Sequence, residues 1–533
     1  MGMVTGMVDR NPLRLRALAC GGLLALGWVS YATAQTEAAG SAGGARSLSI
    51  APGVRTSLFI TDSTNSSGGS HQTGYTYELT PYVDARISNS RTQGTLSYSM
   101  RNFVSHKGDS NDSYMRHDLR ASLNSLLIGD WFGVQGSAAI YNTNASFIGG
   151  LSADPATSAR NNASLRTFSI SPYLQGRVGA FASYRVQYRY DLTDTSNTVQ
   201  AGLSTGSHLL SMNLTGGPQF NPWGWGLSGN ASRRDFQNGV RLGSESAVAT
   251  LFYTPSPELR IGGSINYLHI ERLTNASGDT RGIGPGLSVD WNPGRRTALR
   301  ASLTRQYYGT NEFLSLSHRT TRFVFGLDYA RSVLQSNNAA LLTFNPGDVF
   351  SGGGFAPALN PLFTQLADNG LLSNSNTVIG TNIINDALVR NRTLTASVGY
   401  LMPRWSATAT AFRSARETLL SSEVFGIPNG LSPASFGSFN TRGITLSGLV
   451  TLDARHSVGL STSMRETDAS GATAGSNTAK VRFTTVQGTL NSKIDSRTTA
   501  TLGLRRTVQA SEGLGGGNMN DNTLFGTLDF RLK

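Results

Sequence analysis

The chain has 533 residues and a net charge of +13, yet charged residues make up only 14% of it, against roughly 25% in ordinary soluble proteins. Its arginines are scattered along the chain instead of forming a basic cluster, which argues against nucleic-acid binding. The single cysteine, Cys20, excludes a structural disulfide and any cysteine-based metal site.

The N-terminal residues are predicted to form a secretory signal peptide. Several arginines precede a short apolar run at residues 17–29, and a small-residue A-x-A cleavage site lies just before Gln35. We therefore expect residues 1–34, including Cys20, to be removed, and residues 35–52 to remain as a short periplasmic leader. No later run approaches the ~18 uncharged apolar residues of a transmembrane helix.

Alternating polar and apolar side chains then recur from residue 53 to the C-terminus. Residues 181–191 (FASYRVQYRYD) show the pattern clearly, with apolar or aromatic side chains at even positions and mostly polar or charged ones at odd positions. Because the side chains of a strand have a period of two, each such segment has one face suited to lipid and one suited to water. About 21 segments of this kind can be identified, most of them as long as a tilted transmembrane strand of about 9–11 residues or slightly longer.

The connections between these segments alternate in length. Short turns such as residues 88–90 and 178–180 alternate with long polar stretches such as residues 62–74, 142–164 and 417–439. Tryptophans beside the short turns are expected to form an aromatic girdle at the membrane interface. The pattern predicts an all-β fold, a transmembrane antiparallel β-barrel at residues 53–533 with short periplasmic turns and long extracellular loops.

The alternation breaks once, at an insert of residues 332–390. Residues 296–308 and 318–331 are predicted as successive strands before it, and one further strand is needed to restore the alternation. Residues 338–345 (NAALLTFN) are the candidate, which gives about 22 strands, with 20 as the alternative. Residues 360–372 suit a short helix, so the insert is expected to be either a partial plug of the lumen or a long loop.

The water-facing arginines are the strongest candidates for functional residues in the chain, and we predict that they line the pore. A lumen lined in this way favours anionic solutes. Alternatively, these arginines pair with lumen carboxylates such as Glu78, Asp84, Asp118 and Asp328 and only hold the wall together. The set consists of Arg101, Arg116, Arg120, Arg185, Arg189, Arg300 and Arg505.

Enzyme chemistry has little support in the sequence. The seven histidines never pair at the spacing of helical metal ligands, and no nucleophile elbow of the G-x-S-x-G type is present. We therefore predict no catalytic residue, no metal and no cofactor. A hydrolase at the barrel rim stays as an alternative, because such sites are recognised by geometry and not by spacing.

Three stretches carry a resemblance to a known family. They are LSIAPGVRTSLFITDS at residues 48–63, YARSVLQ at residues 329–335 and NRTLTASVGYLMPRWSATATAFRSARE at residues 391–417. The chain resembles the outer-membrane barrel family associated with PEP-CTERM/exosortase and exopolysaccharide gene clusters of Gram-negative bacteria. This resemblance implies a role in export or surface anchoring of an exopolysaccharide, with no catalytic residue.

Together these observations predict a porin-like outer-membrane channel or scaffold that assists export or surface anchoring of an exopolysaccharide or another anionic polymer. The alternatives are a structural or adhesion barrel with a closed lumen, and the rim hydrolase. The expected partners are outer-membrane lipid, the barrel insertion machinery and polysaccharide export components, without nucleic acid. A TonB-dependent receptor is not expected, because only residues 35–52 precede the first predicted strand.

Overall fold

The computed structural model describes most of the chain from residue 47 onward. The described residues are 47–65, 70–107, 110–144, 162–196, 204–236, 241–272, 280–306, 309–335, 388–420, 436–471, 478–513 and 518–532. The predicted signal peptide and residues 35–46 of the predicted leader lie outside them. Residues 47–52, which were predicted as the end of the leader, instead form the beginning of the first strand. No helix among the described residues is long and apolar enough to cross a membrane.

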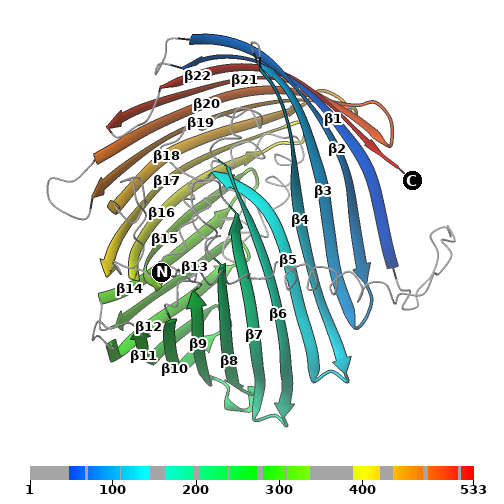
Figure 1. Cartoon of the computed structure of the whole chain (residues 1–533). Coiled ribbons are helices and arrows are strands. Elements are labelled where there is room, and N and C mark those ends of the chain that lie inside the picture. The colour runs from blue at the N-terminus through cyan, green and yellow to red at the C-terminus, as the bar shows by residue number, and fades with distance from the viewer. Residues whose placement is uncertain are drawn as a thin grey trace, which may run out of the picture. The chain divides into compact units, whose positions relative to one another are not determined.

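The described residues form one sheet of 22 strands (Figure 1). The strands are β1 (Ser47–Asn65), β2 (Ser70–Ser88), β3 (Thr92–Lys107), β4 (Ser110–Ile128), β5 (Phe132–Asn144), β6 (Asn162–Val178), β7 (Ala182–Ser196), β8 (Ser204–Gly216), β9 (Trp223–Phe236), β10 (Arg241–Ser256), β11 (Leu259–Arg272), β12 (Thr280–Gly294), β13 (Thr297–Gln306), β14 (Gly309–Arg319), β15 (Phe323–Gln335), β16 (Leu388–Leu401), β17 (Trp405–Leu420), β18 (Phe436–Thr451), β19 (His456–Gly471), β20 (Thr478–Lys493), β21 (Thr498–Gly513) and β22 (Met519–Arg531).

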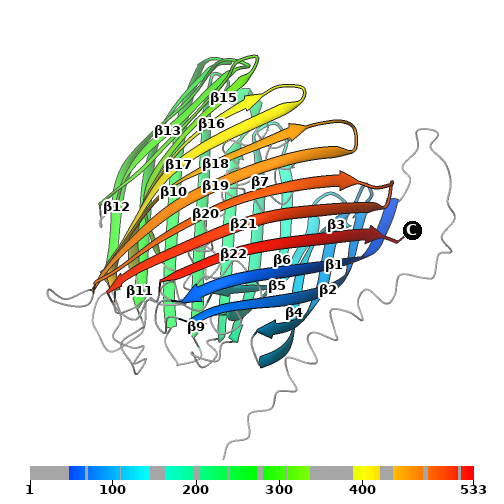
Figure 2. The same cartoon turned by 90° about the horizontal axis from the view of Figure 1, so that it is seen from above.

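The sheet closes on itself. Each strand pairs antiparallel with its neighbours in the chain, and β1 pairs with β22 from Gly53 opposite Arg531 to Asn65 opposite Met519 (Figures 1 and 2). Closure leaves no free sheet edge, so the backbone donors and acceptors of the paired strands can be satisfied within the wall. The prediction of an all-β antiparallel barrel with 22 strands is confirmed.

One strand was assigned wrongly from the sequence. Residues 309–317 fell between the predicted strands at 296–308 and 318–331, whereas they form most of β14, and β15 begins only at Phe323. The turn between them contains neither glycine nor proline, and Thr320 forms it by accepting a hydrogen bond at Oγ1 from the amide of Phe323. β14 completes the count of 22, so the strand proposed at residues 338–345 is not needed; those residues lie outside the described part.

The strands extend beyond the predicted membrane segments. β1 and β2 remain paired up to Asn65 opposite Ser70, so most of the loop expected at residues 62–74 is hairpin. At the opposite rim the turns are tight. At the β18–β19 turn, for example, the backbone amides of Arg455 and His456 donate to Asp453 and hold the pKa of its carboxyl below the usual value.

Contacts that skip a strand identify the concave face of the wall. Tyr82 on β2 donates to Asp529 on β22, across β1, and Tyr173 on β6 donates to Asn124 on β4, across β5. Side chains from next-but-one strands meet in this way on the inside of a curved sheet. The side chains that share this side of the strands therefore line the lumen.

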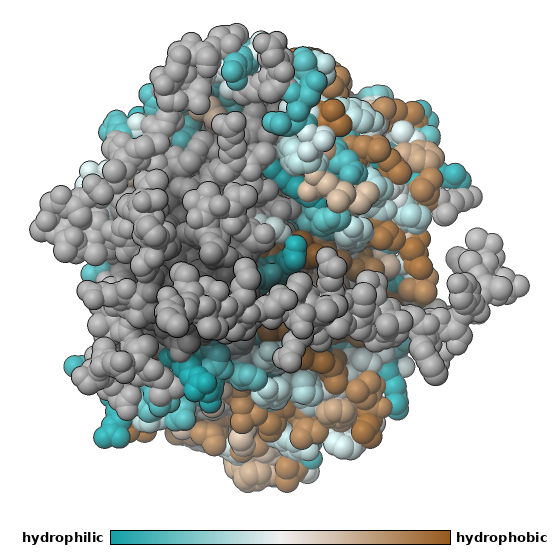
Figure 3. All heavy atoms as spheres, viewed as in Figure 1, coloured by the Kyte–Doolittle hydropathy of each residue, from teal (hydrophilic) through white to brown (hydrophobic). Residues whose placement is uncertain are grey.

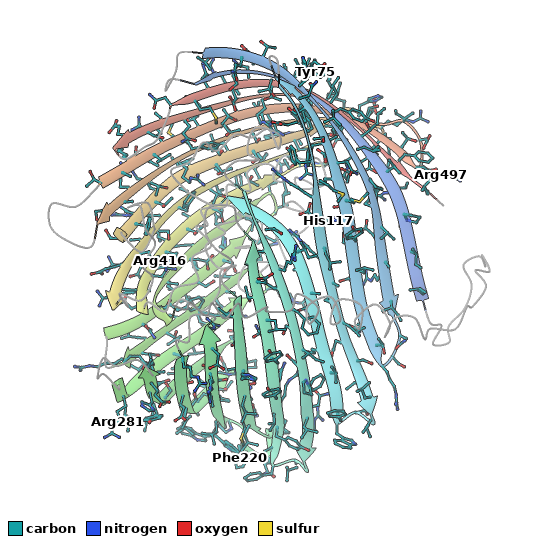
Figure 4. The ribbon with its side chains drawn as sticks, viewed as in Figure 1. Tyr75, His117, Phe220, Arg281, Arg416 and Arg497 are labelled. Atoms are coloured by element: carbon teal, nitrogen blue, oxygen red, sulfur yellow. The ribbon has the colours of Figure 1, made fainter. Side chains whose placement is uncertain are left out.

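The opposite face is apolar over most of its height. Its exposed side chains are leucine, isoleucine and aromatic residues, among them Ile283 at 73% and Leu504 at 65% exposure. Side chains project from both faces of the ribbon (Figure 4), and brown apolar groups are visible on the surface in Figure 3. Together, the two faces give each strand the lipid side and the water side that the alternation predicts.

Candidate functional site: the arginine-rich lumen wall

A buried carboxylate anchors the lumen wall on β2 and β3. Glu78 is 4% exposed and accepts two hydrogen bonds from Arg101, at 2.7 Å from Nε and 3.1 Å from Nη2. Thr80 donates a third bond to Glu78 at 2.8 Å. The two-point contact fixes the plane of the Arg101 guanidinium against the wall. Glu78 is one of the carboxylates that the sequence suggested as arginine partners, and it pairs with Arg101, one of the seven predicted arginines.

A second arginine and two aromatic rings complete this cluster. Arg116 on β4 stands directly opposite Arg101 in the strand register. The rings of Phe103 and Tyr114 stack at a centroid distance of 4.7 Å. Arg101 lies 5.0 Å from the Phe103 centroid, and Arg116 lies 5.0 Å from that of Tyr114. Cation–π attraction therefore helps to hold the two like charges side by side.

A hollow lined by amides and hydroxyls lies further along the wall. Its volume is about 600 Å³, and its polar lining comes from strands β2 to β7. Gln187 on β7 donates to Gln135 on β5 at 3.2 Å, which ties its floor together. The lining includes Arg86, Asn124, Gln135, Ser171, Gln187 and Arg189. Such a surface offers both donors and acceptors to a hydroxyl-rich solute.

Arg185 stands beside this hollow. Its guanidinium lies 4.1 Å from the ring centroid of Tyr173 and donates to Gln175 at 3.2 Å. Arg189, two positions along the same face of β7, forms an ion pair with Asp191 at 2.7 Å. β7 thus presents two arginines to the lumen, one held by a neutral partner and one paired with a carboxylate.

The other predicted arginines are spread around the barrel. Arg120 is opposite Ser97 and Ala139 on β3 and β5. Arg300 on β13 lies 4.0 Å from Asp290, and Arg505 on β21 lies over the ring of Phe525 at 5.7 Å. All seven predicted arginines share the lumen side of their strands. The register brings Arg101 opposite Arg116, and the pairs Arg116 and Arg120 on β4 and Arg185 and Arg189 on β7 lie four residues apart on one face.

The sequence reasoning missed the lumen aromatics. Phe103, Tyr114 and Tyr173 lie on the lumen-facing side of their strands, as the arginines do, and Phe103 is only 1% exposed. A search of the polar face for aromatic residues two positions from an arginine finds Phe103 and Tyr114. No group of three or more histidine, cysteine or acidic side chains suited to a metal ion occurs in the described part of the chain.

No protein-family model and no curated protein matches the chain. Solved structures do match. The FrpB iron transporter from Neisseria meningitidis, F5-1 variant, has a TM-score of 0.50 and 11% identity, over 90% of this chain and 82% of that chain. Its apoprotein form gives a TM-score of 0.51 and 10% identity, over 90% and 81%. The F3-3 variant gives 0.50 and 10%, over 90% and 82%. The likeness is one of fold. It carries no substrate to this chain.

Proposed function

We propose that the chain is an outer-membrane channel that passes an anionic polymer, an exopolysaccharide, through its lumen. The observation that carries the proposal is the lumen wall itself, where arginines outnumber carboxylates and stand among aromatic rings, amides and hydroxyls. The fold likeness to an iron transporter supports a transport role in the outer membrane, and the family resemblance supports the polysaccharide cargo.

The chemistry of the wall suits such a cargo. Guanidinium groups bind carboxylate, sulfate or phosphate substituents through two parallel hydrogen bonds. Amides and hydroxyls such as those of Gln135, Gln187 and Ser171 bind sugar hydroxyls. These groups are spread over many strands, so a polymer meets a series of separate weak contacts instead of one tight site. Each contact can be released as the next one forms, which allows the polymer to advance without being trapped.

The size of the barrel is consistent with a polymer. Barrels with 22 strands enclose a lumen wide enough to hold a plug or to form a passage. The sequence predicts the insert between β15 and β16 to be a partial plug or a long loop, so conductance should be measured both with the full chain and with residues 336–387 replaced by a short turn.

The first test neutralises lumen arginines. The triple variant R120Q/R185Q/R189Q is expected to lower the anion-to-cation permeability ratio by roughly threefold or more in planar bilayers, because fixed charge at the wall selects the permeant ion. The variant R166Q/R233Q/R241Q removes the same charge from the outer face and should leave the ratio unchanged. Equal ratios for the two triples would contradict the proposal.

The second test follows the cargo. A deletion strain should lose exopolysaccharide from the cell surface and retain it in the periplasm, and the full-length gene should restore export. The lumen triple should restore it only in part. Full export by a barrel whose lumen has been closed with an engineered cross-link would instead support the scaffold alternative.

A further inference from the structure

A row of arginines runs across the outside of the barrel on four adjacent strands. Arg331 on β15 is directly opposite Arg392 on β16, and Arg413 on β17 is directly opposite Arg442 on β18. The two pairs are linked because Arg413 also stands opposite Leu394, the next residue on the same face as Arg392. We call these four residues the outer arginine row.

The row lies on the lipid side of the wall. Its neighbours on the same face are exposed apolar residues, Leu394 at 42% and Ile444 at 54% exposure. The residues of opposite parity, such as Thr395 and Thr441, are buried on the lumen side at 6% and 4% exposure. None of the four arginines therefore faces the passage discussed above.

The row stands at the level of the outer interface. Trp405, beside a short turn, marks the opposite interface, and Arg413 follows it by about 27 Å along β17 at ~3.4 Å per residue. At a strand tilt of about 40° this is about 20 Å of height, close to the apolar band of an outer-membrane barrel. The row is on the side of the long connections, which face the cell exterior in such barrels.

The row is electrostatically unbalanced. Like charges directly opposite one another on neighbouring strands are destabilising. Arg392 faces Arg331 on one side and Ala415 on the other, and Arg413 faces Leu394 and Arg442. No directly opposed position gives Arg392 or Arg413 a carboxylate.

The carboxylates at the two ends of the row are already engaged. Glu312 pairs with Arg331 at 3.0 Å. Glu466 forms ion pairs with Arg442, with Arg482 at 2.7 Å and with Lys480 at 3.5 Å, so a single carboxylate neutralises part of the charge of three cations. The outer face of β15 to β20 thus keeps an excess of positive charge centred on Arg392 and Arg413.

The other side of the barrel is different. At the corresponding outward positions β1 to β4 carry apolar and aromatic side chains, among them Ile60, Tyr75, Val104 and Met115, each more than 40% exposed. The outer arginine row therefore has no counterpart on the arc of β1 to β4.

We infer that the outer arginine row binds the phosphorylated headgroup of lipopolysaccharide, the anionic glycolipid of the outer leaflet. Phosphates placed between the opposed guanidiniums accept charge-assisted hydrogen bonds from both and remove their repulsion. The acyl chains then lie against Leu394, Ile444 and Met464 below the row. The inference rests on the outer-membrane location in the proposed function and is independent of what passes through the lumen.

The test compares lipid binding by three matched variants. Barrels purified in mild detergent are titrated with lipopolysaccharide of short core, with the same lipid after phosphatase treatment, and with inorganic phosphate. We expect R392Q/R413Q/R442Q to bind the phosphorylated lipid roughly 30-fold more weakly than the parent chain. R166Q/R233Q/R241Q, whose arginines share their rim with carboxylates such as Asp235 and Asp194, should bind as the parent does.

Each arm has a distinct outcome. Phosphatase treatment should weaken parent binding as much as the row variant does, and inorganic phosphate should not compete at millimolar concentration. Unchanged lipid binding by the row variant, or equal binding of the dephosphorylated lipid, would overturn the inference, and competition by free phosphate would replace it with a simple anion site. The lumen triple R120Q/R185Q/R189Q should retain lipid binding while the row variant retains anion preference, so either proposal can fail alone. Heat-modified mobility on gels confirms that every variant is folded.

Discussion

Replacing Glu78 with glutamine is expected to lower the free energy of unfolding by about 2 kcal/mol, because it leaves a wall arginine without its counter-charge. Breaking a fully buried ion pair costs about 3–5 kcal/mol. Glu78 is nearly inaccessible, but the Arg101 side chain is 31% exposed, so water compensates part of the loss. Repulsion from Arg116 adds to the remaining penalty, because Arg116 is directly opposite Arg101 and lies over the same Phe103 ring.

Glu417 provides the matched control for this prediction. It pairs with Arg390 at 3.2 Å on the outer face, but its side chain is 58% exposed. Changing Glu417 to glutamine should therefore alter stability by less than about 0.5 kcal/mol. Urea unfolding in detergent, followed by tryptophan fluorescence, measures both changes. The double variant E78Q/R101Q should recover part of the loss, and identical unfolding of E78Q and E417Q would show that the buried pair contributes nothing.

The strands were predictable because a barrel wall forces a period of two on the sequence. The same rule explains why the predicted strands end before the observed ones on the side of the long loops. Above the lipid the outer face meets water, so polar residues such as Asp62 and Thr64 occupy outward positions of β1 and the alternation of hydropathy disappears. The backbone pairing continues regardless, because a hairpin needs hydrogen bonds and not apolar side chains.

The missed strand has a different cause. β14 (GTNEFLSLSHR) alternates well from Phe313 to His318, but its turn into β15 lacks the glycine or proline that usually marks a break. Without that mark, residues 309–317 fell between two predicted strands, and the missing strand was placed in the long insert instead. The alternation of short and long connections showed that one strand was missing but not where, because a strand on either side of residues 318–331 restores it. In the structure the missing strand is β14, which closes directly on β13 at Gln306 and Gly309.

The arginines of the lumen were predictable as a set, but their partners were not. Parity alone puts Arg101 and Arg185 on the lumen side. Whether each meets a carboxylate or a ring depends on the register between strands, as with Arg101 and Glu78, and on contacts that cross an intervening strand. Tyr82 and Asp529 meet only because the chain closes into a ring, since they are 447 residues apart in sequence. No local pattern carries that information.

A single methyl group on Gly284 is expected to destabilise the barrel by about 2–3 kcal/mol. A Cβ at this position of β12 would lie 1.8 Å from the carbonyl oxygen of Arg305 on β13. The obstacle is backbone, so it cannot swing aside as a side chain does, and the two strands must separate near the end of their ladder. At Gly503, by contrast, the added atom would meet the ring of Phe525, which has rotatable bonds.

Gly488 and Gly526 are the controls, because a Cβ at either would meet nothing within 4 Å. Alanine there should change stability by less than about 1 kcal/mol, in the stabilising direction where the backbone suits it, since alanine restricts the unfolded chain. The order G284A, then G503A, then G488A should appear in the midpoints of thermal unfolding in detergent. If G284A unfolded with the same midpoint as G488A, β12 and β13 would not approach as closely at this level as the register requires, and the wall would have to be more open between them.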